Sequence, residues 1–556
     1  MEIRQRPFGG SRLVQDWLDG AKEAAEPVPA HPGDPEAYTR RRRALDDDFD
    51  VQRRRTAASL LSGGGSDARA RLERFVEEAG YMVTTGQQPV LFGGPLYVVY
   101  KALTAISLSK RLEEETGRPV LPVFWIASED HDWEEAGSTW VLDQENELRR
   151  TTLPLPDSWR EGVRPALHRT PLDEGVDGLL GDFLSHLPGS EFAPRWRSLL
   201  QDAWQPGRSL PEAFEATLDA LLGEQGLFFV QSHTSGLKEA SLPLLLRELE
   251  QSESHEGALR QAADELTRRG YELQAPILEG GTNVFIDAPE SRERLFRGDA
   301  GEFRLRRSER RMELSALEDA ARRETLLLSP NVFLRPVVEA QVLPTLAYVA
   351  GPGEAAYLAQ VEPLFQAHGV TRPAIHPRMA ADLIETKVGK VLEKYDLAPQ
   401  ELARPHHELV GRLLREDLPE GIRKELGGFR GALARHTKAL AEVVGELDPT
   451  LEPTVKQVQS QGFAQLDEVE RKVVQALKRE NEIALAQLSK AQDHLFPEGK
   501  PQERVMSPWY YLFRYGGELV DRLAREADRF GMGHSPPSLA PAVDEPGWGE
   551  RPGHDL

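Results

Sequence analysis

The stretch PVFWIASEDHDWEE, residues 122–135, changes within a few positions from a wholly apolar segment into a dense group of charges. Residues 122–127 are rich in aromatic and β-branched side chains, which is typical of a strand buried on both faces of a parallel sheet. Six of the next eight residues are ionisable. Ligands of open α/β sheets bind beyond the carboxyl ends of the strands. The stretch therefore predicts a binding cleft at the end of a buried strand.

The charged half of this stretch also indicates chemistry. Five carboxylates beside one imidazole repel one another unless cations, donors or shared protons neutralise them. The carboxylates of residues 132–135 also fit a helix start, where they suit the positive end of the dipole. Clustering directly after the strand favours a functional role for Glu129, Asp130 and His131. We expect Asp130 and Asp132 to hold an amine or a metal, and His131 or Glu129 to act as general base.

Composition excludes several classes of protein. The 556 residues contain 68 Lys plus Arg against 90 Asp plus Glu, a formal charge of -22, which disfavours nucleic acid as an obligate partner. The absence of cysteine excludes disulfides, zinc–thiolate sites and a cysteine nucleophile. The N-terminus lacks an apolar signal core, and no apolar run is long enough to span a membrane. We expect a cytoplasmic protein without a membrane partner.

A second informative stretch is TGQQPVLFGGPLYVVYK, residues 85–101, which follows a strand predicted at 81–84. Its glycines let the backbone turn near a ligand, and a helix predicted over 96–116 would offer free N–H groups to an anion. The stretch matches neither the G-x-G-x-x-G nor the Walker pattern. We expect it to hold an anionic substrate or phosphate. The candidate binding residues are Gln87, Gln88, Gly93, Gly94, Pro95, Tyr97 and Lys101.

A third stretch, SPNVFLRPVVEAQVLPTLAYVAGPGEAAY at residues 329–357, repeats the pattern of strand, glycine turn, acidic residue and helix. Its strand is predicted at 346–350. Arg335 would pair with the 129–135 carboxylates or bind a substrate carboxylate through two hydrogen bonds, and a purely structural ion pair is an equal alternative. The candidate binding residues are Asn331, Arg335, Gln341, Gly351, Gly353, Glu354 and Tyr357.

The remaining sequence suggests the domain organisation. Apolar residues at heptad spacing over 455–495, behind a helix at 421–447 and a proline turn, predict an antiparallel coiled-coil arm, with one side of a helical bundle as the alternative. Its apolar seam predicts a homodimer. A third strand ends at Gln231, Ser232 and His233, to which we assign no role. The expected parts are an N-terminal helical segment (1–80), an α/β core (81–139 and 326–378, with a strand near 226–231), connecting insertions (140–325), a helical coiled-coil domain (379–500), a segment packing on the core (501–530) and a disordered tail (531–556).

Five motifs in order, GQQPVLFGGPLYVVYK, PVFWIASEDHDWEE, SPNVFLRP, AYVAGPGEAAY and QERV, resemble the bacillithiol biosynthesis cysteine-adding enzymes, a family of cysteine ligases. The resemblance implies a Rossmann-like parallel-sheet core related to class I aminoacyl-tRNA synthetase catalytic domains, with connecting inserts and a coiled coil that makes a homodimer. It also implies that cysteine is joined by an amide bond to glucosaminyl-malate, giving bacillithiol. The synthetase H-x-G-H and K-M-S-K-S signatures are absent, which leaves open whether ATP is a cofactor.

Two other functions fit parts of the sequence. A metal-dependent hydrolase would use the same Asp, Glu and His residues to bind a divalent ion and activate water, but a single histidine in the cluster argues against zinc, and no metal site is predicted. A non-enzymatic coiled-coil scaffold would explain the heptads but not the charge cluster. An amide-forming ligase is therefore the leading hypothesis.

Overall fold

The computed structural model describes residues 1–20, 30–156, 159, 164–287, 291–305, 310–324, 327–416, 420–480 and 482–531. The chain forms two compact units. A helical unit comprises Met1–Glu2 and Leu383–Gln502, and an α/β unit comprises Ile3–Asp382 and Glu503–Leu556. The disordered tail expected over 531–556 lies, except for Gly531, outside the described residues. In the described part of the chain, every helix is too short or too polar to cross a lipid bilayer.

The α/β unit is organised around a six-stranded sheet with the strand order β14-β13-β3-β4-β7-β2. Strand β2 pairs antiparallel with β7, and all other neighbours are parallel. Every residue of β4 and β13 is buried, as their apolar composition predicts. The predicted Rossmann-like parallel core is confirmed. The strands are β2 (Ser62–Gly63), β3 (Tyr81–Gln87), β4 (Val120–Ile126), β7 (Phe228–Gln231), β13 (Thr345–Ala350) and β14 (Ala374–Pro377).

The connections of this sheet reverse direction between β3 and β13. Helix α5 (Leu96–Thr116) leads from β3 to β4, and β7 follows on the same side, whereas β13 and β14 lie on the other side of β3. Ligands of doubly wound sheets bind in the crevice beyond the carboxyl ends of the strands at such a reversal. The loops that follow β13, β3, β4 and β7 all leave this edge, because these four strands are parallel.

The insertions between β4 and β13 supply walls beside this edge. A five-stranded antiparallel sheet in the order β11-β10-β9-β8-β12 lies in the second part of the insertion. The elements before it are α6 (Trp133–Ala136), β5 (Ser138–Leu142), β6 (Leu148–Thr152), α7 (Gly175–His186), α8 (Ala193–Ala203), α9 (Leu210–Leu222), α10 (Ser235–Glu250) and α11 (Ser252–Arg268). The strands of this antiparallel sheet, and the helices within and after it, are β8 (Gly281–Asp287), β9 (Arg292–Arg297), β10 (Glu302–Leu305), β11 (Arg311–Glu313), α12 (Leu314–Arg323), β12 (Leu328–Pro330), α13 (Arg335–Val342) and α14 (Pro352–Ala367).

Segments from both ends of the sequence complete the α/β unit. Glu503 is fully buried and accepts hydrogen bonds from Arg6 at 2.7 Å and from Arg378 at 2.6 Å. The indole of Trp509 donates to the carbonyl of Phe92 at 2.6 Å. The terminal elements are β1 (Glu2–Gln5), α1 (Arg12–Leu18), α2 (Pro35–Asp48), α3 (Val51–Ser59), α4 (Ala68–Glu77), α20 (Gln502–Val505), α21 (Trp509–Tyr515) and α22 (Glu518–Gly531).

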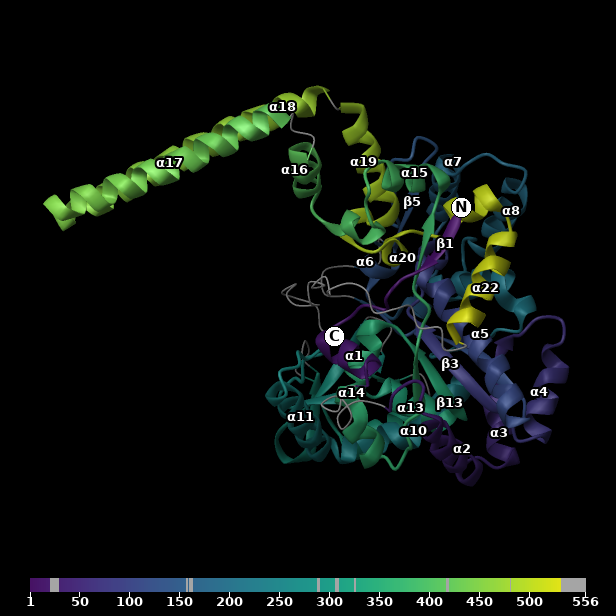
Figure 1. Cartoon of the computed structure of the whole chain (residues 1–556). Helices are drawn as coiled ribbons and strands as arrows, with labels where there is room; N and C mark the ends of the chain where they lie inside the picture. The colour runs from purple at the N-terminus through teal and green to yellow at the C-terminus, as the bar shows by residue number, and fades with distance from the viewer. Residues whose placement is uncertain are drawn as a thin grey trace. The chain divides into compact units, whose positions relative to one another are not determined.

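The helical unit contains the expected antiparallel arm, in which α17 and α18 lie side by side (Figure 1). Arg430 of α17 bonds to Asp467 at 2.6 Å and to Glu470 at 2.8 Å, both on α18. The predicted heptad run does not continue into α19. Instead, Leu488 and neighbouring apolar residues of α19 pack into a small core with α15 and α16, because those helices cover its apolar face. The elements are β15 (Ala381–Ile384), α15 (Thr386–Lys394), α16 (His406–Glu416), α17 (Glu420–Leu447), α18 (Glu452–Glu480) and α19 (Glu482–Leu495).

Candidate functional site

The loops after β4 and β7 meet at the carboxyl edge of the sheet. Ile126 and Gln231 are paired at the ends of these parallel strands, so the residues that follow them are neighbours. The Ser128 hydroxyl lies 2.8 Å from Nδ1 of His233, and the backbone N–H of Glu129 donates to the Ser232 hydroxyl at 3.3 Å. The second loop, for which no role was predicted, therefore belongs to the candidate site.

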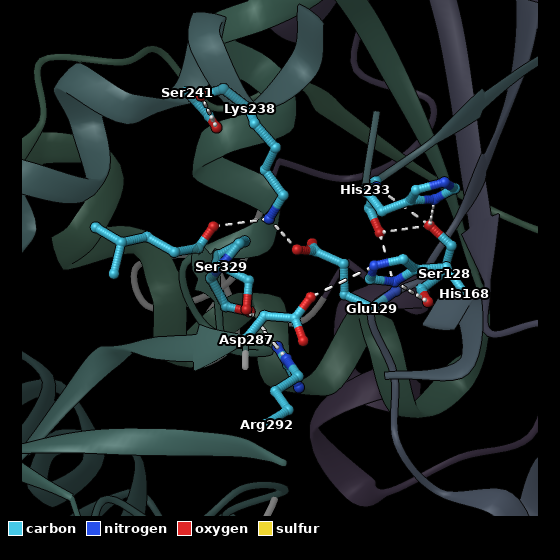
Figure 2. Close-up of polar contacts among 12 residues, drawn as sticks. Ser128, Glu129, His168, His233, Lys238, Ser241, Asp287, Arg292 and Ser329 are labelled. Carbon is cyan, nitrogen blue, oxygen red and sulfur yellow. Dashed lines mark hydrogen bonds and ion pairs between the residues drawn. The ribbon is translucent and has the colours of Figure 1, made fainter. Parts of the chain in front are cut away.

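Glu129 is engaged in a buried ion pair. Its carboxylate contacts the ammonium of Lys238 from α10, which also donates to the Leu328 carbonyl at 2.7 Å (Figure 2). Burial lowers the pKa of Lys238, and Asp287 offsets part of this shift. The pair joins the β4 loop to α10 and β12. Of the two general-base candidates, Glu129 is thus held by a cation, and His131 remains accessible.

Asp130 and Asp132 shape the loop that presents His131. One carboxylate oxygen of Asp130 accepts the backbone N–H groups of His131 at 2.6 Å and Asp132 at 3.1 Å. Asp132 caps α6 by accepting the N–H of Glu135 at 3.0 Å, so the helix-start interpretation is confirmed for this residue. These bonds fix the backbone on both sides of His131.

The imidazole of His131 faces a guanidinium from the inserted sheet. Nη1 of Arg292 lies 3.4 Å from Nδ1 of His131, and the His131 side chain is 18% exposed. Burial, and next the charge of Arg292, lower the pKa of His131 to about 4. The ring is therefore neutral at pH 7, and its Nδ1 lone pair faces the guanidinium, because a guanidinium can only donate.

His168 and Asp287 from the insertions complete this cluster (Figure 2). The ring of His168 stacks on that of His233 with centroids 4.4 Å apart. Its Nδ1 lies 3.2 Å from the Ser128 carbonyl, and its Nε2 lies 3.5 Å from Asp287, which also accepts from Arg169 at 3.2 Å. His168 and Asp287 could not be predicted from the sequence because each is isolated in it, whereas the strand-exit pattern could have indicated His233.

A second cluster lies at the reversal of strand order, between the ends of β3 and β13. Lys101 of α5 is buried, and its ammonium donates to the Gly86 carbonyl at 2.7 Å and to the Gln87 amide oxygen at 3.2 Å. It also forms an ion pair with Glu354, which accepts the N–H of Gly351 at 2.8 Å. Four of the candidate binding residues are thus brought together here.

Arg335 belongs to this second cluster and not to the 129–135 cluster. It forms an ion pair with Glu339 at 2.7 Å and donates to the hydroxyls of Tyr348 and Tyr357, each at 3.2 Å. Tyr348 in turn donates to Glu354 at 2.6 Å. Arg335 therefore makes the structural ion pair that the sequence analysis kept as an alternative, and it reaches the ligand-facing edge through tyrosine hydroxyls.

Comparison with known proteins identifies the family of this chain. Residues 1–379 match the family model described as "Bacillithiol biosynthesis BshC, N-terminal Rossmann-like domain", and residues 381–535 match its C-terminal coiled-coil domain. The chain belongs to the BshC family. The resemblance seen in the five sequence motifs is confirmed.

Curated BshC proteins resemble the chain over most of its length. Proteins named "Putative cysteine ligase BshC" from Heliobacterium modesticaldum and Salinibacter ruber are 37% and 34% identical over 83% and 82% of this chain, covering 84% and 82% of their own lengths. A third, from Symbiobacterium thermophilum, is 33% identical over 80% of this chain and 81% of its own.

The glycine turn after β3 is buried in this BshC-family chain. Gly93 and Gly94 are buried, and a Cβ on Gly93 would lie 3.0 Å from Thr217. The first N–H of α5, on Leu96 directly after Pro95, already donates to the Met506 carbonyl at 2.8 Å. Few donors of this turn are therefore left for an anion.

Tyr97 and Gln88 link the two clusters. The charged groups of Lys101 and Arg378 lie 6.0 and 5.6 Å from the centroid of the Tyr97 ring. Burial raises the pKa of Glu135, and the adjacent Gln88 amide lowers it in part. Arg378 was not identified from the sequence, because it follows a strand without an acidic or glycine motif.

Of the three remaining candidates, Asn331 and Gln341 lie outside both clusters, and Gly353 is two residues from Gly351 of the second cluster. The Asn331 side chain accepts the N–H groups of Phe333 and Leu334 at 3.0 and 2.9 Å and donates to Asn283 at 2.8 Å. Gln341 lies at the end of α13, before the amino end of β13, so it faces the opposite edge of the sheet. Gly353 lies in the first turn of α14.

We predict a loss of stability in mild acid from the buried histidines. Burial is the leading reason that the pKa values of His131, His168 and His233 fall from 6.5 to about 4. The unfolded chain therefore binds more protons than the folded chain, so the stabilisation is complete above pH 6.5 and is lost as the pH falls toward 4. The urea midpoint should drop between about pH 6.5 and 5, above the ordinary carboxylate range. A His168→Gln/His233→Gln variant should lose less over this interval, and equal losses would contradict the prediction.

Proposed function

We propose that this chain is a cysteine ligase of bacillithiol biosynthesis, which forms an amide bond between the carboxyl group of cysteine and the amine of glucosaminyl-malate in the cytoplasm. Membership of the BshC family and the names of its curated relatives support the reaction class. The observation that carries the assignment of the site is a neutral imidazole, His131, next to the guanidinium of Arg292 at the carboxyl edge of the sheet.

His131 and Arg292 suit the two needs of amide formation. The amine must lose a proton as its nitrogen attacks, and the carbonyl oxygen gains negative charge as the new bond forms. When the carbonyl oxygen takes the hydrogen bond of the guanidinium, the Nδ1 lone pair of the neutral imidazole is released and can accept that proton, and the guanidinium stabilises the oxygen. We assign the first role to His131 and the second to Arg292. The leaving group of the activated cysteine then departs, and the proton remains on His131 until solvent removes it.

The cluster at the reversal of strand order suits the acidic part of the second substrate. Nε of Arg378 is buried and makes no hydrogen bond within the described structure. A Cβ on Gly351, at the start of α14, would lie 3.7 Å from this nitrogen. A helix N-terminus with a guanidinium beside it favours an anion. The N–H of Gly351 itself is already donated to Glu354. We therefore assign the malate carboxylates to Gly353, in the first turn of α14, and to Nε of Arg378.

The test supplies the purified protein with cysteine and glucosaminyl-malate, with and without ATP, and measures the coupled thiol by mass spectrometry. Product formation supports the ligase, and dependence on ATP decides whether that cofactor activates the carboxyl group. Glucosamine without malate is the matched control, because it keeps the amine but lacks the two carboxylates. Absence of product under all conditions, from protein shown to be folded by circular dichroism, would overturn the proposal.

We also propose that the arm formed by α17 and α18 makes a homodimer. Leu466 is only 9% exposed, so the hairpin already covers this position of the predicted apolar seam. Other apolar side chains are open to solvent. They include Phe429 (63%), Leu440 (50%), Val458 (52%) and Val469 (48%). Phe429 and Leu440 are eleven residues apart, as are Val458 and Val469, which is about three helical turns and places each pair on one face of its helix.

We expect Phe429→Glu with Val469→Glu to convert a dimer into a monomer at micromolar concentration. Full burial of each apolar side chain would contribute about 1.5–3 kcal/mol to association, and the new charges would have to be desolvated. Light scattering measures the mass. Lys438→Glu is the control, because it changes an exposed position about two and a half turns along α17 from Phe429, on the opposite face of the helix. A monomeric mass for the unmutated protein would refute the dimer.

A further inference from the structure

A buried group of two histidines and one glutamate lies in the α/β unit, outside the site described above. Glu248 is on α10, His255 is on α11 and His368 follows α14. Nδ1 of His255 and Nε2 of His368 lie 2.6 and 2.9 Å from the same carboxylate oxygen of Glu248. One potential ligand atom from each residue lies within 4.8 Å of the other two. Three separate elements thus direct donor atoms to one point.

The charge of Glu248 requires a buried positive partner. The side chain is fully buried. The described hydrogen bonds to its carboxylate come from the two imidazoles and from the Asn283 amide at 2.8 Å, with no lysine or arginine among these donors. Burial alone would raise the pKa of Glu248, but the hydrogen bonds from His255 and His368 lower it. An isolated buried carboxylate is costly, so an imidazolium or a metal ion must balance it.

We propose that Glu248, His255 and His368 bind one divalent transition-metal ion of the zinc type. Two imidazole nitrogens and one carboxylate oxygen are a donor set of three-ligand zinc sites, whose fourth position is filled by water. Imidazole donors also disfavour magnesium and calcium, which prefer oxygen ligands. Three protein ligands and an exchangeable fourth position predict an ion that a chelator can remove.

The surroundings provide an outer shell for the ion. Asn283 donates to the second carboxylate oxygen of Glu248, and Asn331 donates to Asn283 at 2.8 Å. Hydrogen bonds to a ligating carboxylate orient it and tune metal affinity. Asn331 directly follows β12, whose Ser329 and Pro330 accept hydrogen bonds from Arg292 at 3.0 and 2.9 Å. The bound ion would therefore brace the strand that positions Arg292, without taking part in the reaction.

Two of the three metal ligands have exposed neighbours in the sequence. His255 lies in the first turn of α11, where Glu253 and Ser254 are exposed. His368 lies between the exposed residues Ala367 and Gly369. The three ligands are buried, but His255 and His368 are each next to an exposed residue in the sequence. The site therefore lies near the protein surface.

The test loads the EDTA-treated, full-length protein with Co²⁺ or Zn²⁺, removes free metal by gel filtration and measures bound metal by mass spectrometry. We expect one ion per chain, a visible Co²⁺ absorption typical of imidazole ligands at low coordination number, and a melting temperature that rises with Zn²⁺. His255→Gln and His368→Gln should abolish all three signals. Asn283→Ala should weaken binding by about 10- to 100-fold, as outer-shell substitutions do.

The control His186→Gln removes a more exposed imidazole, 33% accessible, on α7 and should leave metal binding unchanged. If the unmutated protein retains no stoichiometric metal and shows only the spectrum of hydrated Co²⁺, an imidazolium balances Glu248 and the proposal is wrong. Equal metal content in the unmutated protein and in folded His255→Gln would also overturn it. Neither readout depends on ligase activity, so this test is independent of the proposed function.

Discussion

Replacing Lys238 by methionine is expected to lower the free energy of unfolding by about 3–5 kcal/mol, because it leaves the buried Glu129 carboxylate without its cation. Methionine has a similar length and preserves most of the packing. The substitution also removes the hydrogen bond to the Leu328 carbonyl. Urea unfolding at pH 7 measures the loss, and coupling activity should disappear because the β4 loop loses its attachment to α10.

A double-mutant cycle separates the ion pair from the packing. Glu129→Leu added to Lys238→Met removes both charges, so it should recover much of the lost stability while activity remains absent. Lys110, on the exposed surface of α5, provides the control Lys110→Met, which should change stability by less than about 0.5 kcal/mol. If Lys238→Met lowers the free energy of unfolding by less than about 1 kcal/mol, the ion pair with Glu129 does not hold the β4 loop to α10.

The second large effect concerns the chemical step. His131→Ala should lower the rate of coupling by about 10²–10⁴-fold, the usual contribution of a positioned general base. The unfolding free energy should stay close to that of the unmutated protein, because the ring is partly exposed and its one described hydrogen bond, to Arg292, is long at 3.4 Å. Initial rates at saturating substrates measure the effect, together with urea unfolding.

Two further variants test this assignment. Asp130→Asn keeps the acceptor for the N–H groups of His131 and Asp132, so it should fold normally, and we expect it to abolish coupling if the charge of Asp130 holds the amine. Glu134→Gln is the control, because it neutralises an exposed carboxylate of the same stretch. Near-normal activity in His131→Ala would contradict this role of His131 and would indicate His233, whose imidazole lies in the adjacent loop, as the general base.

The parts of the fold that were predictable depend on local pattern. Helix α5 and strand β13 were located closely because an apolar run bounded by glycine or proline specifies both the element and its ends. The heptads predicted α18 as part of the arm, but not that α19 packs elsewhere. Heptad spacing says which face of a helix is apolar, and it does not say which neighbour covers that face.

The site was predictable where charge follows a strand and not where tertiary contacts supply the partner. Asp130 and His131 were found from their own stretch. Lys238 is 109 positions from Glu129 in sequence, and no local rule connects them. The same holds for Arg292, whose relation to His131 depends on how the inserted sheet packs. Gln341 was selected because it precedes a strand, yet the ligand edge lies at the other end.

The division of the α/β unit into two chain segments has a consequence for biosynthesis. The carboxylate of Glu503 joins Arg6 to Arg378, so residues from both ends of the sequence and from the end of the sheet are neutralised together. The 120 residues of Leu383–Gln502 are translated after Arg378 and before Glu503. Until Glu503 emerges, the nascent chain lacks the carboxylate that accepts hydrogen bonds from both Arg6 and Arg378. The α/β unit therefore matures only after the helical unit has been translated, and the helical unit can fold first.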